Sequence, residues 1–243
     1  ANVSIGISSS DTTEGTVSAS TLTFTSGNWN TPQTVTVTGV NDSVDDGNIA
    51  YTITTAAATS TDGSYSGLNA SDVSVTNTDD DTSGVTVGAV SGNTTEAGVT
   101  ATFTVVLDSE PTGDVVVTAV SADTTEGTAS PASLTFTSVN WATPQTVTLT
   151  GVNDSVDDGN ITYSITLATD DTATLDALYD SVDPADPSLS NTDNDTAGIT
   201  VSTISGSTTE AAGTATFTVV LDSQPTANVS IGISSSDTTE GTV

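Results

Sequence analysis

The sequence predicts an all-β protein built from tandem β-sandwich domains. Thr and Val alternate with a period of two residues in one segment after another, which is typical of strands with one buried face. The chain also repeats itself, because residues 28–54 match residues 140–166 at 23 of 27 positions. No segment shows the helical periodicity of about 3.6 residues. A repeat this long favours a row of separate sandwich domains over a solenoid, whose coils are shorter.

Seven strands are expected in the one stretch that holds a whole repeat, residues 82–195. Phe103, Val105 and Leu107 alternate with Thr and Val, so one face of their strand is predicted to be buried. The other strands show the same alternation. The seven predicted strands are residues 84–90, 100–107, 115–120, 134–136, 145–152, 161–167 and 188–191.

The repeat also sets the predicted domain boundaries. Residues 1–17 return unchanged as residues 227–243. We therefore expect the last five strands of one domain in residues 1–81, a complete domain in 82–195 and the first three strands of a third domain in 196–243. The expected architecture is a linear array of seven-stranded β-sandwich domains.

The composition excludes several functional classes. The chain has 31 acidic residues and no Lys, Arg or His, which gives a formal net charge of -31. Nucleic acid is an unsuitable partner, because no cationic side chain can contact a phosphate. Without His, Cys or Lys the chain also lacks the usual nucleophiles and bases, so we expect no enzymatic activity. Zero Cys rules out disulfide bonds, which leaves metal ions as the available cross-links.

Acidic residues are concentrated in loops that should meet at one end of each domain. The ten residues Gly39–Asn48 return unchanged as Gly151–Asn160. In an up-and-down series of strands, the first, third and fifth loops lie at the same end, where the seventh strand also finishes. The predicted metal ligands from these loops are Glu14, Asp42, Asp45, Asp46, Asp79, Asp81, Glu96, Glu126, Asp154, Asp157, Asp158, Asp193, Asp195 and Glu210.

The predicted metal is Ca²⁺, with more than one ion at each junction between domains. Ca²⁺ takes six to eight oxygen ligands, whereas Mg²⁺ keeps its waters and demands a tight octahedron. The alternative is that these acids are solvated loop residues on a strongly acidic surface. Recurrence of the whole set at one end of the domain favours the metal.

The motifs resemble those of the Calx-β family, the calcium-binding repeat of sodium–calcium exchangers and giant bacterial surface proteins. They include Thr-Thr-Glu96-Ala-Gly, Ala-Thr-Phe103-Thr-Val-Val-Leu-Asp108-Ser and the closing Asp193-Asn-Asp195-Thr-Ala-Gly. The resemblance implies a Greek-key, Ig-like sandwich whose loop acids bind Ca²⁺. Asp157-Asp158 depart from the pattern, because Glu is commoner there. The Thr-rich composition is most similar to that of the repeats of bacterial adhesins and extracellular fibres.

The expected function is therefore a calcium-stiffened, non-enzymatic repeat of an extracellular filament or adhesin stalk on a bacterial cell surface. Near-identical domains add length without adding new chemistry. The alternative is a surface binding module that recognises a glycan or protein through its variable loops, residues 56–72 and 168–186.

The expected partners are neighbouring copies of the same repeat. These copies are joined either in one long chain or head-to-tail between chains, in which case residues 196–243 complete the partner's residues 1–81 by strand complementation. Eight Asn-X-Ser/Thr sequons make glycans a further candidate. No membrane span is expected, because the apolar runs are only a few residues long.

Overall fold

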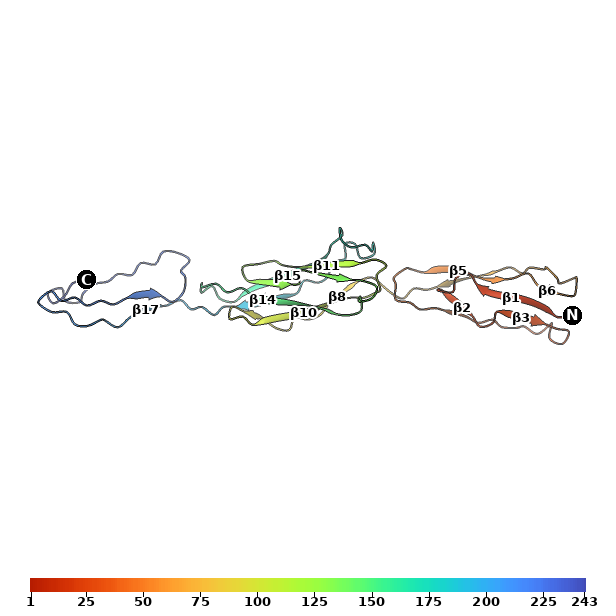
Figure 1. Cartoon of the computed structure of the whole chain (residues 1–243), viewed down its shortest axis with the longest axis horizontal. Coiled ribbons are helices and arrows are strands. Elements are labelled where there is room, and N and C mark those ends of the chain that lie inside the picture. Colours follow the sequence, from red (N-terminus) through yellow and green to blue (C-terminus); the bar gives the residue numbers. More distant parts are fainter.

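The computed structural model describes residues 1–243 and contains 18 strands and no helix. In Figure 1 the N-terminal unit (residues 1–81), the middle unit (82–195) and the C-terminal unit (196–243) follow one another along the long axis. The all-β class predicted from the alternation of Thr and Val is therefore confirmed. No element of the structure has the form of a membrane-crossing helix.

The middle unit consists of two sheets, an arrangement consistent with a β-sandwich. The four-stranded sheet has the order β12-β14-β10-β8, and the five-stranded sheet has the order β13-β11-β15-β16-β9. All pairings are antiparallel except that of β16 with β9. The strands are β8 (Val85–Val87), β9 (Thr94–Thr95), β10 (Thr100–Leu107), β11 (Val115–Ser121), β12 (Gly127–Ser130), β13 (Ser133–Phe136), β14 (Gln145–Gly151), β15 (Ile161–Thr169) and β16 (Ser188–Thr192).

The core of the middle unit is a cluster of 16 buried apolar residues. Phe103 on β10 pairs with Val147 on β14, and both side chains are buried. From the other sheet, Val117 and Ile165 are completely inaccessible to solvent. Burying each such side chain contributes roughly 1.5–3 kcal/mol relative to exposure. This core fixes the positions of the strand ends from which the acidic loops start.

Each of the seven strands predicted in this unit has a counterpart, but the structure has nine strands there. The prediction of one strand over residues 84–90 was wrong in extent. β8 ends at Val87, and the chain then crosses to the other sheet, where β9 runs parallel to β16. β12 was also missed, because it has only four residues and no large apolar side chain.

The N-terminal unit has one well-developed sheet and only a small remnant of a second. The larger sheet has the order β3-β1-β5-β7 with β6 also on β1, while β2 pairs only with β4. Three buried residues, Ile7, Tyr51 and Ile53, form its core cluster. The strands are β1 (Val3–Ser9), β2 (Gly15–Val17), β3 (Thr21–Phe24), β4 (Val37–Gly39), β5 (Ile49–Thr55), β6 (Thr59–Ser60) and β7 (Val73–Asn77).

The C-terminal unit contains a single pair of strands, β17 (Ile199–Val201) and β18 (Val219–Leu221). Every residue of β17 is exposed. Residues 227–243 form no strand here, although the same sequence forms β1 and β2 at the other end of the chain. The same residues therefore become strands only where neighbouring strands are present to pair with them.

Candidate metal centre

The acidic loop connects two strands in both complete copies and folds in the same way each time. Residues 40–48 link β4 to β5, and residues 152–160 link β14 to β15. Gly47 and Gly159 have φ values of 77° and 78°, in the left-handed region that glycine adopts without strain. The loop sequence therefore contains glycine at the one position where its backbone requires it.

Aspartates at the start of the loop and after the last strand hold this shape. The Asp154 carboxylate accepts a hydrogen bond from the N–H of Val156 at 2.7 Å. The Asp193 carboxylate accepts one from the N–H of Gly159, also at 2.7 Å. Asp42 and Asp79 make the equivalent bonds in the N-terminal unit, at 2.9 and 2.7 Å. The second carboxylate oxygens of Asp193 and Asp79 also accept hydrogen bonds, from the N–H groups of Asp195 and Asp81 at 2.7 and 2.9 Å.

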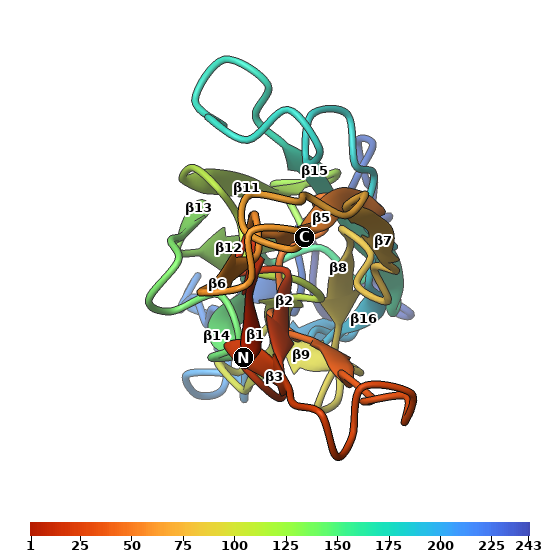
Figure 2. The same cartoon turned by 90° about the vertical axis from the view of Figure 1, so that its right-hand side faces the viewer.

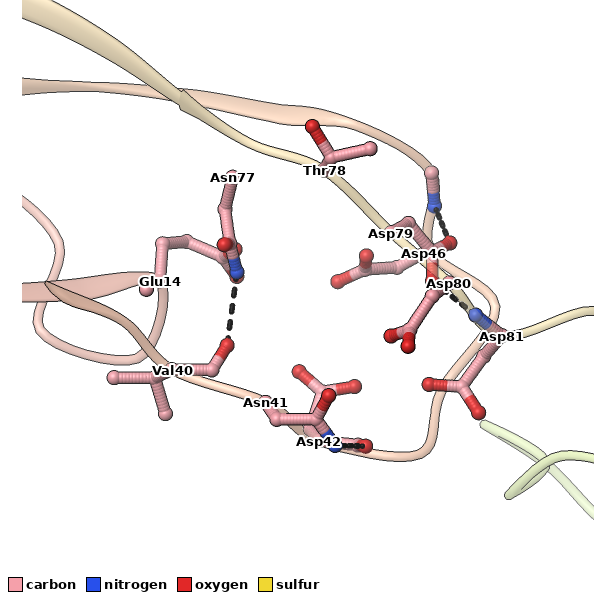
Figure 3. Close-up of a pocket in the computed structure, with 12 residues that line it drawn as sticks. Glu14, Val40, Asn41, Asp42, Asp46, Asn77, Thr78, Asp79, Asp80 and Asp81 are labelled. Atoms are coloured by element: carbon pink, nitrogen blue, oxygen red, sulfur yellow. Dashed lines mark hydrogen bonds between the residues drawn. The ribbon is translucent and has the colours of Figure 1, made fainter.

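The N-terminal acidic group consists of Glu14, Asp42 and Asp46, each with a carboxylate oxygen within 4.8 Å of the others. Figure 3 shows Asp42, Asp46 and Asp80 pointing into the same hollow. Its wall holds only one apolar residue. The lining is Glu14, Gly39, Val40, Asn41, Asp42, Asp46, Gly47, Asn77, Thr78, Asp79, Asp80 and Asp81. Carboxylate, amide and backbone oxygens are the ligands of hard divalent cations.

The middle acidic group consists of Glu96, Asp193 and Asp195, again with oxygens within 4.8 Å of one another. Glu96 is buried and accepts a hydrogen bond from the N–H of Asn194 at 3.2 Å. One carboxylate oxygen of Asp195, Oδ2, is buried without any hydrogen-bond partner. A buried carboxylate oxygen without a donor is costly, and a bound cation would satisfy it.

Glu126 lies next to the middle acidic group. It is buried, and Asp154 and Asp158 are among the carboxylates that act on it electrostatically. Asp154 acts in the same way on Glu96. Asp154 therefore lies within electrostatic reach of both buried glutamates, and the acids of four chain segments meet at this end of the unit.

Burial disfavours the charged form of several of these acids. It raises the pKa of Glu96 and of Glu126, and repulsion from Asp154 adds to the effect on both. Burial likewise raises the pKa of Asp46, with a further contribution from Asp42. Two carboxylates about 5 Å apart repel by roughly 3 kcal/mol at an effective dielectric constant near 20. Because the chain has no basic side chain, the neutralising charge must come from solution.

Asp193 behaves differently from its neighbours. The backbone N–H groups of Asp195 and Gly159 donate to it and lower its pKa. Asp193 is therefore held in the ionised form that a metal ligand needs. The middle acidic group therefore combines one carboxylate that is held ionised, Asp193, with one whose ionisation is disfavoured by burial, Glu96.

Two predicted ligands, Asp45 and Asp157, lie outside both acidic groups and contact the next unit instead. The Asp45 carboxylate accepts a hydrogen bond from the N–H of Ser83 at 2.7 Å, and Asp157 accepts one from Ala197 at 2.7 Å. The recurrence of both residues in the repeated loop was visible in the sequence. The sequence did not show that the Asp45 and Asp157 side chains point toward the next unit, because that direction depends on the conformation of the loop's backbone.

The backbone of the same loop makes a second contact with the next unit. The carbonyl of Ser43 accepts a hydrogen bond from the N–H of Glu110 at 2.7 Å, and that of Ser155 accepts one from Gln224 at 2.6 Å. The loop that carries the acids is thus bonded at two points to the following unit, at both junctions. Sequence reasoning did not reveal this pair of contacts.

The remaining predicted ligands are placed as follows. Asp79 and Asp81 line the N-terminal hollow, and Asp158 is among the carboxylates that act on Glu126. Glu210 is exposed and belongs to neither acidic group. Its unit lacks the strands that would bring the other acids to it.

Comparison with known proteins gives no relative for this chain. No protein-family model matches it, and no curated protein is significantly similar to it. The two acidic groups, each able to hold a metal ion, and the paired hydrogen bonds at both junctions are therefore the main observations from which a function can be argued.

Proposed function

We propose that this chain is a calcium-stiffened structural segment of an extracellular filament or adhesin stalk on a bacterial surface. Its units would be Calx-β-like, Greek-key sandwiches in a linear array, with neighbouring copies of the repeat as partners and no enzymatic role. One observation carries the proposal. The loop that supplies Asp42 and Asp46 to an acidic group also bonds the next unit through Asp45 and Ser43.

This shared loop couples metal binding to the geometry of the junction. Without a cation, repulsion among Asp42, Asp46 and Asp79 acts on the same short loop that positions Asp45. A bound cation removes the repulsion and ties the loop to Asp81, directly before the next unit. The loop's contacts with Ser83 and Glu110 then hold the two units at a fixed angle.

Calcium is preferred among the divalent cations because of the donor set. The N-terminal hollow offers several carboxylates, two amide side chains and backbone carbonyls within one loop cluster. Ca²⁺ accepts such a large and irregular oxygen shell, whereas Mg²⁺ retains its water. More than one ion at each junction would match the number of acids present.

Thermal unfolding with and without a chelator tests this function. A ligand that binds only the folded state adds about 4 kcal/mol of stability at a thousandfold excess over its Kd. We expect a chelator to lower the melting temperature, and Ca²⁺ but not Mg²⁺ to restore it. Asp180→Asn removes an exposed carboxylate outside the acidic groups. As a control, this variant should respond to the chelator and to Ca²⁺ as the unaltered chain does. A melting curve unchanged by chelator would contradict the proposal.

A second candidate function, recognition of a glycan or protein, is favoured by one loop of the middle unit. Residues 170–187 protrude from the body of the molecule in Figure 2. The buried Tyr179 anchors the loop, and its hydroxyl lies 2.8 Å from the hydroxyl of Ser109. Leu175 is nevertheless 74% exposed, as expected of a contact residue. Binding of the chain to bacterial or host glycans, abolished by Leu175→Ser without loss of thermal stability, would support this role.

A further inference from the structure

The variable loop of the middle unit, residues 170–187, lies at the end of that unit that faces the N-terminal unit. It comprises all of the chain between β15 and β16. Figure 1 shows it rising from the middle unit beside the junction. The acidic loop of the N-terminal unit meets the middle unit at two points near this loop, the backbone N–H groups of Ser83 and Glu110.

The variable loop is bonded along one continuous segment of the middle unit, residues 109–116. The buried Asp176 carboxylate accepts hydrogen bonds from the N–H of Thr112 at 2.6 Å and from its hydroxyl at 3.0 Å. The N–H of Leu175 donates to the carbonyl of Asp114 at 2.7 Å. Because these bonds follow one another along both partners, the position of the segment depends on the loop.

The hydroxyl of Tyr179 fixes the start of the same segment. It accepts a hydrogen bond from the N–H of Ser109 at 3.2 Å and donates one to the Ser109 carbonyl at 2.7 Å. Both residues are buried, so water cannot replace these bonds. The variable loop therefore holds Ser109 through Tyr179 and Thr112 through Asp176, and Glu110 lies between these two fixed points.

Ser83 and Glu110 link the variable loop to the acidic loop of the preceding unit. The N–H of Ser83 donates to the Asp45 carboxylate at 2.7 Å, and its hydroxyl donates to the carbonyl of Leu178, in the variable loop, at 3.2 Å. The N–H of Glu110 donates to the carbonyl of Ser43 at 2.7 Å. The two residues that receive the acidic loop are thus the two that the variable loop holds in place.

We propose that the variable loop is a brace for this junction, which holds Ser83 and Glu110 where the acidic loop of the preceding unit can bond to them. Donors that are already fixed lose less conformational freedom when they form their bonds, so the braced contact is the stronger one. Tyr179 and Asp176 are accordingly positioning residues for the junction. The proposal rests on these hydrogen bonds and does not require a metal ion, so it goes beyond the calcium-dependent function.

The distance between spin labels on the two units measures how firmly the junction is held. The labels are placed at Ser74→Cys and Ser133→Cys, exposed strand positions of the N-terminal and middle units. Tyr179→Phe removes the hydroxyl that bonds to Ser109 but keeps the ring that fills the core. In Ca²⁺ this variant should give a broader distribution of distances between the labels than the unaltered chain does.

Gly113→Ala displaces the variable loop without removing any of its hydrogen-bonding groups. A Cβ at this position would lie 2.9 Å from backbone atoms of Leu175, which is too close for packed atoms, so the loop must move away. We expect the same broadening. Tyr163→Phe is the matched control, because it removes another buried hydroxyl, 3.1 Å from the Thr94 hydroxyl, next to the acidic loop of the middle unit itself. It should leave the distribution unchanged.

Stability alone cannot identify a brace, because Tyr179 also belongs to the core cluster of the middle unit. We expect both Tyr179→Phe and Tyr163→Phe to lower the melting temperature, while only the first broadens the distribution of distances. Broadening by Tyr179→Phe and Gly113→Ala, but not by Tyr163→Phe, would support the proposal. Any other pattern would overturn it.

Amide hydrogen exchange offers a second measurement that requires no label. In Tyr179→Phe the N–H groups of Ser83 and Glu110 should exchange faster, because their acceptors lie across the loosened junction. The N–H groups of β10 and β14 should stay protected, which shows that the unit remains folded. Unaltered exchange at both Ser83 and Glu110 would overturn the proposal.

The experiment separates the brace from the proposed metal function. Comparison of the unaltered chain in Ca²⁺ and in chelator tests whether the metal stiffens the junction. Comparison of the variants with the unaltered chain, all in Ca²⁺, tests the brace. Equal widths with and without Ca²⁺ would therefore contradict the metal function while leaving the comparison of variants valid.

Discussion

Asp45, in the acidic loop of the N-terminal unit, accepts a hydrogen bond at 2.7 Å from the backbone N–H of Ser83, at the start of the middle unit. The same contact recurs one repeat later between Asp157 and Ala197, at the same distance. In both loops, a carboxylate that lies between two other aspartates in sequence thus reaches forward to the next unit. In the N-terminal unit, the loop that supplies Asp42 and Asp46 to the acidic group therefore also makes the contact with the next unit.

Replacing Asp45 and Asp157 by Ala should loosen both junctions without unfolding the units. Each change removes a charge-assisted hydrogen bond that is partly exposed, and we expect it to cost about 1 kcal/mol or less at its own junction. Small-angle X-ray scattering should show a broader distribution of molecular dimensions. The melting temperature of the middle unit should stay unchanged. Asp180→Ala, the control, should change neither the melting temperature nor the scattering profile. A scattering profile identical to that of the unaltered chain would contradict a role for these two residues.

Glu96→Gln should have opposite effects with and without Ca²⁺. In chelator the melting temperature should stay the same or rise, because burial disfavours the charged form of Glu96. In Ca²⁺ the affinity should fall at least about tenfold, since one carboxylate ligand is lost. Calorimetric titration measures the affinity, and Glu110→Gln, on an acid outside both acidic groups, is the matched control. Unaltered Ca²⁺ affinity would remove Glu96 from the site.

The metal-free protein should become more stable as the pH falls from neutrality toward about 4.3, the ordinary pKa of Glu. Burial raises the folded-state pKa of Glu96 and Glu126, so the folded state binds their protons more tightly than the unfolded state does. Their contribution is fully present below the unfolded pKa and is lost as the pH rises through the folded pKa. Relief of repulsion across the whole chain acts in the same direction.

At lower pH the trend should reverse. The pKa of Asp123 is lowered first by its hydrogen bond from the Thr125 hydroxyl, and that of Asp193 by backbone N–H groups. These acids stabilise the fold above their unfolded pKa and lose that effect as the pH falls through the folded value. Melting temperatures in chelator between pH 3 and pH 7 test both trends. The double variant Glu96→Gln, Glu126→Gln should flatten the upper part of the curve, and an unchanged slope would contradict the assignment.

Two glycine substitutions should separate backbone strain from steric overlap. Gly159→Ala places a side chain at a φ of 78° but meets no atom within 4 Å, so it should cost about 1–2 kcal/mol through strain alone. Gly127→Ala would drive a methyl group into the ring of Tyr163 in the core, which typically costs about 1–3 kcal/mol. Denaturant unfolding measures both costs in free energy.

Gly159→Ala should also affect metal binding. Gly159→Ala should lower Ca²⁺ affinity as well as stability, because it lies in the acidic loop. Gly92→Ala, at an open position where the backbone is not left-handed, should be close to neutral and serves as the control. If Gly159→Ala were equally neutral, the backbone of the acidic loop would not depend on glycine.

Much of the fold was predictable because alternation and repetition are strong signals in this chain. Phe103, Val105 and Leu107 identified the buried face of β10 correctly. β9 and β12 were not predictable, since β9 has only two residues and β12, unlike the equally short β13, has no large apolar side chain. They form because β16 and β14 already provide edges on which they can pair.

The candidate site was predictable in its residues but not in their geometry. Recurrence from one repeat to the next revealed the acids, including those of both acidic groups. The unpartnered Oδ2 of Asp195 and the forward reach of Asp157 depend on how neighbouring backbones approach one another in three dimensions. The anchoring of the variable loop through Tyr179 depends on a long-range contact with Ser109 that no local pattern indicates.

The most direct test of the central claim is the spread of distances across one junction with and without Ca²⁺. Spin labels at Ser74→Cys and Ser133→Cys would lie on exposed strand positions of the N-terminal and middle units, in a chain with no other cysteine. Pulsed electron–electron double resonance should give a narrow distribution of distances between the two spin labels in Ca²⁺ and a broad one in chelator or Mg²⁺. Distributions of equal width in all three conditions would contradict a metal-stiffened junction.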